Sequence, residues 1–185
     1  MFEMLHFRDA DKILKKKHML NDVKTTLEYI GDVLSGVQFK GELFRQALEE
    51  MGWRENGTLN ILEGRRYLWK GLKKSVAIEG SFAAYEFILE GLLRLQIGFD
   101  KGMLETGILL LTSKRSEKSP YGSTSKMVKE EIEMLYPTIS LPVTVVLFDL
   151  DDPEIMDDNG SEAAFEETGG TEHGASVPTD EQLYP

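Results

Sequence analysis

Residues 75–112 carry the pattern that most restricts how this 185-residue chain can fold. The apolar run 76–78 ends in a single carboxylate, Glu79, and is followed by a helix-like stretch at 83–97 and a second apolar run at 103–112. Short apolar runs on either side of a helix indicate neighbouring strands covered on both faces. Because a charge is costly to desolvate there, we expect Glu79 to have a functional partner, most naturally a divalent metal ion.

The rest of the chain predicts an α/β fold with a mixed β-sheet flanked by helices. Residues 1–55 are predicted to be helical, with amphipathic helices at 21–36 and 41–51. Three β-rich runs, at 58–62, 65–69 and 75–79, predict a meander. After the 103–112 run, a further helix is predicted at 125–135 and a buried strand at 142–149.

Charge is distributed very unevenly along the chain. The formal net charge is -11, but residues 149–185 hold twelve of the 32 acidic residues and none of the 21 Lys and Arg residues. The part before residue 149 is therefore nearly neutral, and its bases are clustered, which leaves a nucleic-acid surface open. The acidic segment 151–185 is predicted to be disordered, with a role in solubility or in binding a protein partner.

Several chemistries are excluded or disfavoured by composition. The chain has no cysteine, which excludes disulfides, thiolate zinc sites and cysteine nucleophiles. The three histidines lack a second ligand at metal spacing, and no glycine-rich loop has nucleotide-binding spacing. No apolar run reaches membrane-spanning length and no signal-peptide pattern opens the chain, so we expect a soluble cytoplasmic protein.

The segment GWRENGTLNILEGRRYLWKGLKKSVAIEGSFAAYEFILEGLLRLQIGFDKGMLETGILLLT resembles the core of the BglII-type restriction endonucleases, a branch of the PD-(D/E)xK nuclease superfamily. The shared features are a Gly-Trp after a helix, a strand of the form V-A-[VI]-E, a long Leu-rich helix and a strand entered through a Gly-rich turn. The likeness covers about 39–149. It implies a restriction-endonuclease-like domain at 1–150, with an α/β core at 56–150, followed by the acidic tail, and it implies a homodimer.

In that family an Asp and the Glu of V-A-[VI]-E bind Mg²⁺, and a third polar residue orients the attacking water. The resemblance makes Glu79 a catalytic metal ligand. The Asp position falls on Lys70, and no Asp occurs between Met51 and Phe99. The third position holds Ser81, which would reach a metal only through a water.

Two other carboxylates are candidates for the second metal ligand. Glu63 lies sixteen residues before Glu79 and would serve if it lies on the strand beside it; the alternative is an ordinary turn residue in EGRR. Glu86 follows Glu79 by seven residues and would serve if it faces the same pocket; the alternative is a solvated helix face. Two carboxylates and water suffice for one Mg²⁺.

Clustered bases are the candidates for contacts with the DNA backbone, since each neutralised phosphate adds salt-dependent affinity. The candidates are Arg65, Arg66, Lys70, Lys73, Lys74, Lys114, Arg115, Lys118 and Lys126. The alternatives are solubilising turn residues at 73–74, an ordinary polar loop at 113–126, and protection of an edge strand at 65–66 with Trp69 in the core.

Two hypotheses for function remain. In the first, the chain is a Mg²⁺-dependent endonuclease that hydrolyses DNA phosphodiester bonds as a homodimer, with Glu79 and either Glu63 or Glu86 as ligands. In the second, the nuclease fold is catalytically inactive and binds DNA or a protein partner as a subunit or regulator. A second carboxylate close to Glu79 would favour the first hypothesis.

Overall fold

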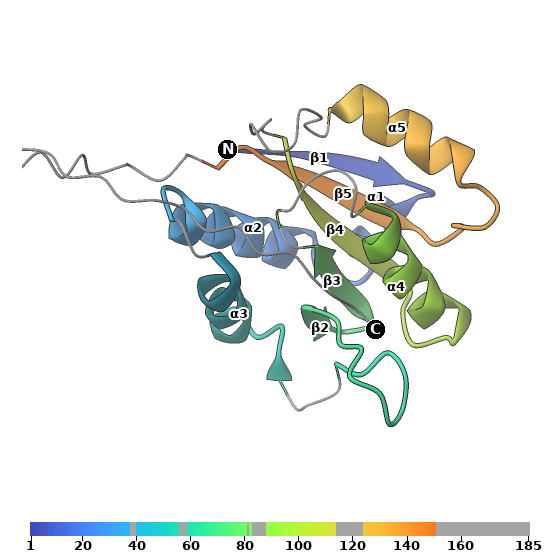
Figure 1. The fold of residues 1–185 in the computed structure, drawn as a ribbon, viewed down its shortest axis with the longest axis horizontal. Coiled ribbons are helices and arrows are strands. Elements are labelled where there is room, and N and C mark those ends of the chain that lie inside the picture. Colours follow the sequence, from blue (N-terminus) through green and yellow to red (C-terminus); the bar gives the residue numbers. More distant parts are fainter. Residues whose placement is uncertain (38–39, 56–58, 81, 83–87, 114–123, 151–185) are drawn as a thin grey trace, which may run out of the picture. The chain divides into compact units, whose positions relative to one another are not determined.

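The computed structural model describes residues 1–37, 40–55, 59–80, 82, 88–113 and 124–150. In this part of the chain a five-stranded sheet lies between helices on its two faces (Figure 1). The elements are β1 (Phe2–Phe7), α1 (Ala10–Lys16), α2 (Leu20–Leu34), α3 (Lys40–Glu50), β2 (Gly71–Lys73), β3 (Val76–Gly80), α4 (Ile88–Asp100), β4 (Thr106–Thr112), α5 (Ser125–Met134) and β5 (Val143–Phe148). The predicted acidic tail lies outside the described residues.

The sheet is mixed, with the strand order β1-β5-β4-β3-β2. The three central strands are parallel, while β1 pairs antiparallel with β5 and β2 pairs antiparallel with β3 at the two edges. Parallel neighbours need long crossover connections. Helices α4 and α5 lie in these connections, between β3 and β4 and between β4 and β5. The prediction of a mixed sheet flanked by helices is confirmed.

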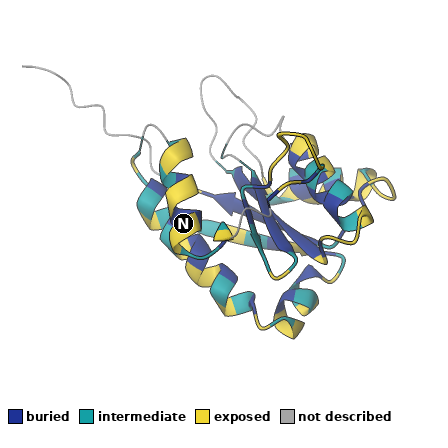
Figure 2. Cartoon of the chain, turned by 90° about the horizontal axis from the view of Figure 1, so that it is seen from below, coloured by how far each residue is buried: buried dark blue, intermediate teal, exposed yellow. Residues whose placement is uncertain are grey.

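Both faces of the central strands are buried (Figure 2). One face packs against α4 and α5 through residues that include Leu92, Leu95 and Ile132. The other packs against α1, α2 and α3 through residues that include Leu27 and Leu48. Strands covered on both faces have to be apolar along their whole length, which accounts for the continuous apolar runs in the sequence.

The prediction that residues 1–55 are helical is wrong at its start. Residues 2–7 form the edge strand β1, in which Phe2 pairs with Phe148 and Phe7 pairs with Val143. Leu5 and Phe7 join the core on the α4/α5 side. The partner strand lies about 140 residues further along the chain, so the local pattern of FEMLHF could not specify it.

The first two strands of the predicted meander, at 58–62 and 65–69, are also wrong, while the third corresponds to β3. The part of 58–69 that the structure describes forms one isolated bridge, between Asn60 and Leu68. The strand beside β3 is instead β2, in the segment predicted to be a turn. The chain reverses at Lys74 and Ser75, whose φ angles are 49° and 60°. Such two-residue turns usually carry Asn-Gly or Asp-Gly, so Lys74-Ser75 did not mark the exact position of this tight turn.

Helix α4 continues past Gly98, the residue predicted to end it. A Cβ at Gly98 would lie 2.4 Å from Cζ2 of Trp69, so this glycine permits close packing. The helix is closed by Gly102, which has a φ of 67° and donates its N–H to the Phe99 carbonyl at 2.9 Å.

Among the described residues, no helix has both the length and the apolar character that crossing a membrane requires.

A buried glutamine joins α4 to the segment that enters β5. The side-chain oxygen of Gln96 accepts the backbone N–H groups of Ser140 at 2.8 Å and Leu141 at 2.9 Å. Its amide donates to Asp100 at 2.7 Å and to the Ser140 hydroxyl at 3.2 Å. Gln96 therefore satisfies two backbone donors that no strand or helix pairs.

We predict that Gln96→Ala lowers the free energy of unfolding by about 2 kcal/mol, because it leaves these buried donors unpaired. Urea denaturation measures the change. The control Gln46→Ala removes an exposed 3.3 Å hydrogen bond to Glu42 and should change stability by less than about 0.5 kcal/mol. Equal effects of the two substitutions would contradict the structural role of Gln96.

Candidate functional site at the end of β3

Glu79 lies near the end of β3, on the sheet face that α4 covers. Side chains alternate along a strand; Val76 and Ile78 join the core on the α2/α3 side, whereas Ala77 joins the core on the α4/α5 side. Glu79 therefore faces α4. Its residue is only 3% exposed, so a carboxylate sits in the sheet interior as the sequence predicts.

The Glu79 carboxylate has few polar contacts among the described residues. Oε2 accepts a long hydrogen bond from the Gly80 N–H at 3.4 Å, and Oε1 is buried without a partner. Burial raises the pKa of Glu79 from its ordinary value of 4.5 to about 7, against the opposing effects of Arg94, the Gly80 hydrogen bond and Lys70. Near neutral pH the group is poised between its charged and neutral forms.

The residue after Glu79 is a glycine for a steric reason. Gly80 has a φ of 112°, and a Cβ at this position would lie 2.1 Å from the carbonyl oxygen of Leu110 on β4. Only glycine combines this conformation with so close an approach to the neighbouring strand. Gly80 thereby fixes the direction in which the chain leaves Glu79.

Three charged residues that act on Glu79 belong to elements separate from β3. Glu90 and Arg94 lie one turn apart on α4 and form an ion pair of 2.6 Å; the third is Lys70, just before β2. The positive charges of Arg94 and Lys70 lower the pKa of Glu79, and the negative charge of Glu90 raises it. The sequence analysis did not identify Glu90 and Arg94, although a four-residue spacing of opposite charges in an otherwise apolar helix indicates an ion pair.

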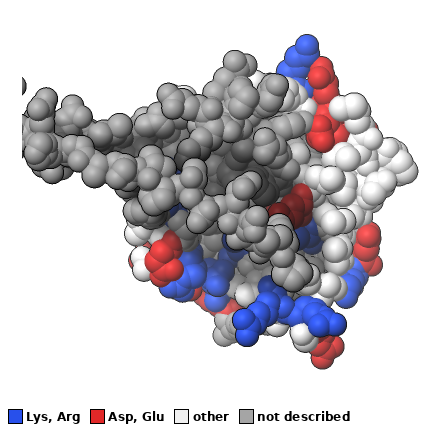
Figure 3. Space-filling view, in the orientation of Figure 1, with Lys and Arg blue, Asp and Glu red and all other residues white. Residues whose placement is uncertain are grey.

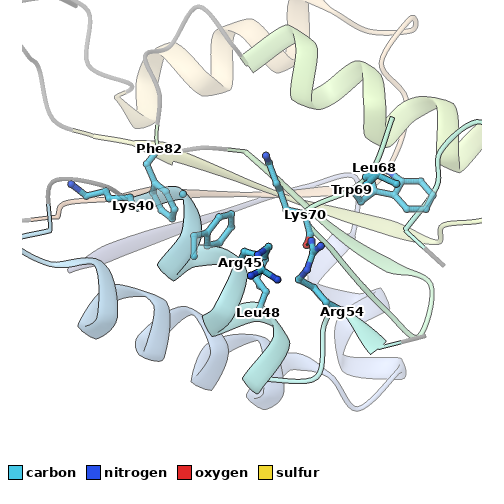
Figure 4. Close-up of a pocket in the computed structure, with 10 residues that line it drawn as sticks. Lys40, Arg45, Leu48, Arg54, Leu68, Trp69, Lys70 and Phe82 are labelled. Atoms are coloured by element: carbon cyan, nitrogen blue, oxygen red, sulfur yellow. The ribbon is translucent and has the colours of Figure 1, made fainter. Parts of the chain in front are cut away.

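Lys70 is held beside the end of β3 by its backbone. Its N–H donates to the carbonyl of Ile78 at 3.0 Å, and its own carbonyl accepts from Nη1 of Arg54 at 2.6 Å. The ammonium group has no ion pair or hydrogen bond within the described part of the chain. Figure 4 shows this side chain directed away from Arg54.

Lys70 also lines a cavity of about 280 Å³ between α3 and the segment before β2 (Figure 4). Among the described residues, its lining combines four bases with apolar side chains and no acidic side chain: Lys40, Gly41, Phe44, Arg45, Leu48, Arg54, Leu68, Trp69, Lys70 and Phe82. Figure 3 shows Lys and Arg side chains gathered along the edge of the molecule where α3 and the loop before β2 lie. The cavity suits a negatively charged ligand.

Two of the cavity's bases already have acidic partners. Arg45 pairs with Glu42 and Glu49 on its own helix, and Arg54 lies 3.3 Å from Glu49. Lys40 donates to the carbonyl of Val37 at 2.7 Å. Lys70 is therefore the base of this cavity whose ammonium has no partner among the described residues.

Glu63, Arg65 and Arg66 lie in the loop before β2. The Arg65 N–H closes a turn by donating to the Leu62 carbonyl at 3.2 Å. Glu63 and both arginines are exposed, and neither arginine forms an ion pair with a described residue. Trp69, at the end of the loop, is 1% exposed and belongs to the core. Glu63 is thus a turn residue, not a strand neighbour of Glu79 as the second-ligand prediction required.

Lys73 and Lys74 lie at the opposite end of β3 from Glu79, because Lys73 pairs with Val76, about 10 Å from Glu79 along the strand at the usual rise per residue. Lys73 forms an ion pair of 2.9 Å with Asp22 and lies over the ring of Trp53. Lys74 is exposed at the tip of the β2–β3 turn. The structure therefore does not bring either lysine to the group around Glu79.

The remaining predicted residues lie on α5 or in the segments that follow β3 and β4. Lys126 is exposed on α5, 3.8 Å from Glu130. Ser81, Glu86, Lys114, Arg115 and Lys118 lie outside the described residues. Their assignments stay predictions.

Among the residues that the structure describes, no group of three His, Cys, Asp or Glu side chains is arranged to hold a metal ion. The described donors near Glu79 consist of its own free oxygen and of Glu90, which is paired with Arg94. Basic groups from two other elements surround this carboxylate. The described residues therefore bring one free carboxylate oxygen to this position, with the positive charges of Lys70 and Arg94 acting on it.

The fold matches two solved structures of the restriction endonuclease BglII. The crystal structure of BglII complexed with a DNA 16-mer superposes with a TM-score of 0.56 and 15% sequence identity, over 80% of this chain and 77% of that chain. Free BglII superposes with a TM-score of 0.52 and 15% identity, over 82% and 80%. This chain has a BglII-like restriction endonuclease fold. No protein-family model matches the sequence, and no curated protein matches it significantly.

We predict that Glu79 makes the protein less stable as the pH rises. A carboxyl whose pKa is raised by folding binds its proton more tightly in the folded state, so its contribution is greatest below pH 4.5 and is lost as the pH rises to about 7. Glu79→Gln should remove roughly 2 to 3 kcal/mol of the stability difference between pH 5 and pH 8. Urea denaturation at the two pH values measures it.

The exposed Glu63 provides the control. Glu63→Gln makes the same chemical change at an exposed turn position and should leave the stability difference between pH 5 and pH 8 unchanged. If Glu79→Gln and Glu63→Gln gave the same pH dependence as the unmodified chain, the burial of a titrating Glu79 would be refuted.

Proposed function

We propose that this protein binds duplex DNA, with the phosphate backbone lying against the basic residues around the end of β3. The observation that carries the proposal is the group of bases there, combined with a BglII-like fold. Lys70 and Arg94 act on Glu79 from two different parts of the chain, and the described lining of the cavity that Lys70 joins has four bases and no acid. One of the matching BglII structures is a complex with DNA, which supports DNA as the ligand.

The exposed arginines of the loop before β2 extend this surface. Arg65 and Arg66 have no described ion pair, so neither must break a contact in order to meet a phosphate. Tyr67 beside them is 53% exposed and adds an aromatic group. Contacts of this kind set affinity and position without reading the base sequence.

Hydrolysis of DNA with Mg²⁺ is the second candidate function. The observation in its favour is the buried Oε1 of Glu79, which lacks a hydrogen-bond partner. Against it, the described residues fit Mg²⁺ poorly, because they supply one free carboxylate with basic groups beside it. Catalysis would need Glu86 or Ser81 to complete the set, or DNA phosphate oxygens as the other ligands. We therefore assign binding, and we assign no catalytic step.

We predict that the protein binds a labelled duplex in a salt-dependent manner and that Arg65→Gln/Arg66→Gln weakens this binding. Each lost phosphate contact should reduce the slope of log K against log salt by about 0.9, so the double substitution should reduce it by about two. Fluorescence anisotropy at several salt concentrations gives the slope.

The control Lys15→Gln/Lys16→Gln removes the same charge from exposed positions on α1. It should leave the slope nearly unchanged. An equal reduction by both double substitutions would indicate non-specific attraction and would contradict the proposed surface.

Incubation of duplex plasmid with Mg²⁺ or Mn²⁺ decides between binding and cleavage. The binding proposal predicts intact plasmid with either ion. Metal-dependent cutting that disappears in Glu79→Ala would establish the second candidate instead. The homodimer, the partner of the acidic tail and the cytoplasmic location stay predictions.

A further inference from the structure

We infer that Lys70 takes the place of a divalent cation at this site, so that the protein binds the DNA phosphate backbone without a metal ion. The inference rests on the proposed DNA-binding function and specifies its chemistry. It follows from the charges that the fold itself brings to Glu79. The resemblance predicts an acidic residue at this position, and the chain has a base there.

The first argument is the position of Lys70. Its backbone is fixed on one side by Ile78, the residue before Glu79, and on the other by Arg54. The positive charge is close enough to lower the pKa of Glu79. A bound cation between two carboxylates would supply the same charge, so Glu79 already has part of its counter-charge from the protein.

The second argument is that Lys70 remains available to a ligand. Its neighbours Arg45 and Arg54 both pair with Glu49, whereas the Lys70 ammonium has no ion pair or hydrogen bond to a described residue. A buried or half-buried base normally acquires a partner. A phosphate oxygen supplies that partner as a charge-assisted hydrogen bond.

The third argument is electrostatic. Glu90 already neutralises Arg94 at 2.6 Å, so a divalent cation at Glu79 would meet the Lys70 ammonium with one free carboxylate among the described residues to offset it. A phosphate in the same place meets the Lys70 ammonium, which has no ion pair among the described residues, and it can share the Arg94 guanidinium with Glu90. The phosphate is therefore favoured over the metal ion.

The test compares duplex binding in EDTA and in Mg²⁺ at equal ionic strength. We expect equal affinity in the two conditions for the unmodified chain. Lys70→Gln should weaken binding roughly 5- to 10-fold in both and reduce the salt slope by about one. The control Lys101→Gln, at an exposed position after α4, should leave both quantities unchanged.

Lys70→Asp provides a gain-of-function measurement. It adds a second carboxylate near Glu79, so it should bind Mn²⁺ at least 10-fold more tightly than the unmodified chain. The decrease of the free Mn²⁺ signal in electron paramagnetic resonance measures this without DNA. Lys101→Asp makes the same charge change and should gain no Mn²⁺ affinity. Circular dichroism checks that each variant is folded. If Lys70→Asp does not fold, the duplex-binding measurement on Lys70→Gln tests the inference.

The outcomes separate the inference from the proposed function. Binding to duplex only in the presence of Mg²⁺, or Lys70→Gln with unchanged affinity, would overturn the inference and leave the DNA-binding function standing. Failure to bind duplex in either condition would overturn both. Tight Mn²⁺ binding by the unmodified chain would also overturn the role given to Lys70.

Discussion

The burial of both faces of the parallel strands is the constraint on which the rest of this structure depends. Strands β3, β4 and β5 lie between helices on either side, so their buried side chains are nearly all apolar, apart from Glu79 and the threonines Thr106 and Thr144. A charged residue within them is desolvated wherever it stands. Glu79 is the residue of β3 that departs from this pattern, and its raised pKa is the direct consequence. The same covering helix, α4, supplies Arg94, which offsets part of that cost.

The site combines groups that are distant in sequence because the segment before β2 and helix α4 both lie beside the end of β3. The backbone pairing of Lys70 with Ile78 sets one side, α4 sets the second, and the glycine after Glu79 directs the chain past β4. The result is a carboxyl with bases from two elements and a cavity with a basic lining beside it. Such an arrangement attracts phosphate, which connects the BglII-like fold to the proposed binding of DNA.

Much of this could be predicted from periodicity alone. The helices α2, α3 and α5 and the strands β3, β4 and β5 follow from apolar spacing, and so does the burial of Glu79. The edge strands could not be predicted, because β1 depends on a partner at the other end of the chain and β2 depends on a turn at Lys74–Ser75 without a glycine. The strand that the second-ligand prediction required at Glu63 is absent, because the chain forms an exposed turn there. Lys70 was recognised at the position of the missing Asp, but its free ammonium is a feature of the three-dimensional packing.

The central claim is that Glu79 is a desolvated carboxyl beside a positive charge. The most direct measurement is a titration of the Glu79 side-chain carboxyl carbon by ¹³C nuclear magnetic resonance in the free protein. The structure predicts a midpoint near pH 7. A midpoint near 4.5, the value of an ordinary glutamate, would show that water reaches the carboxylate and would contradict the account.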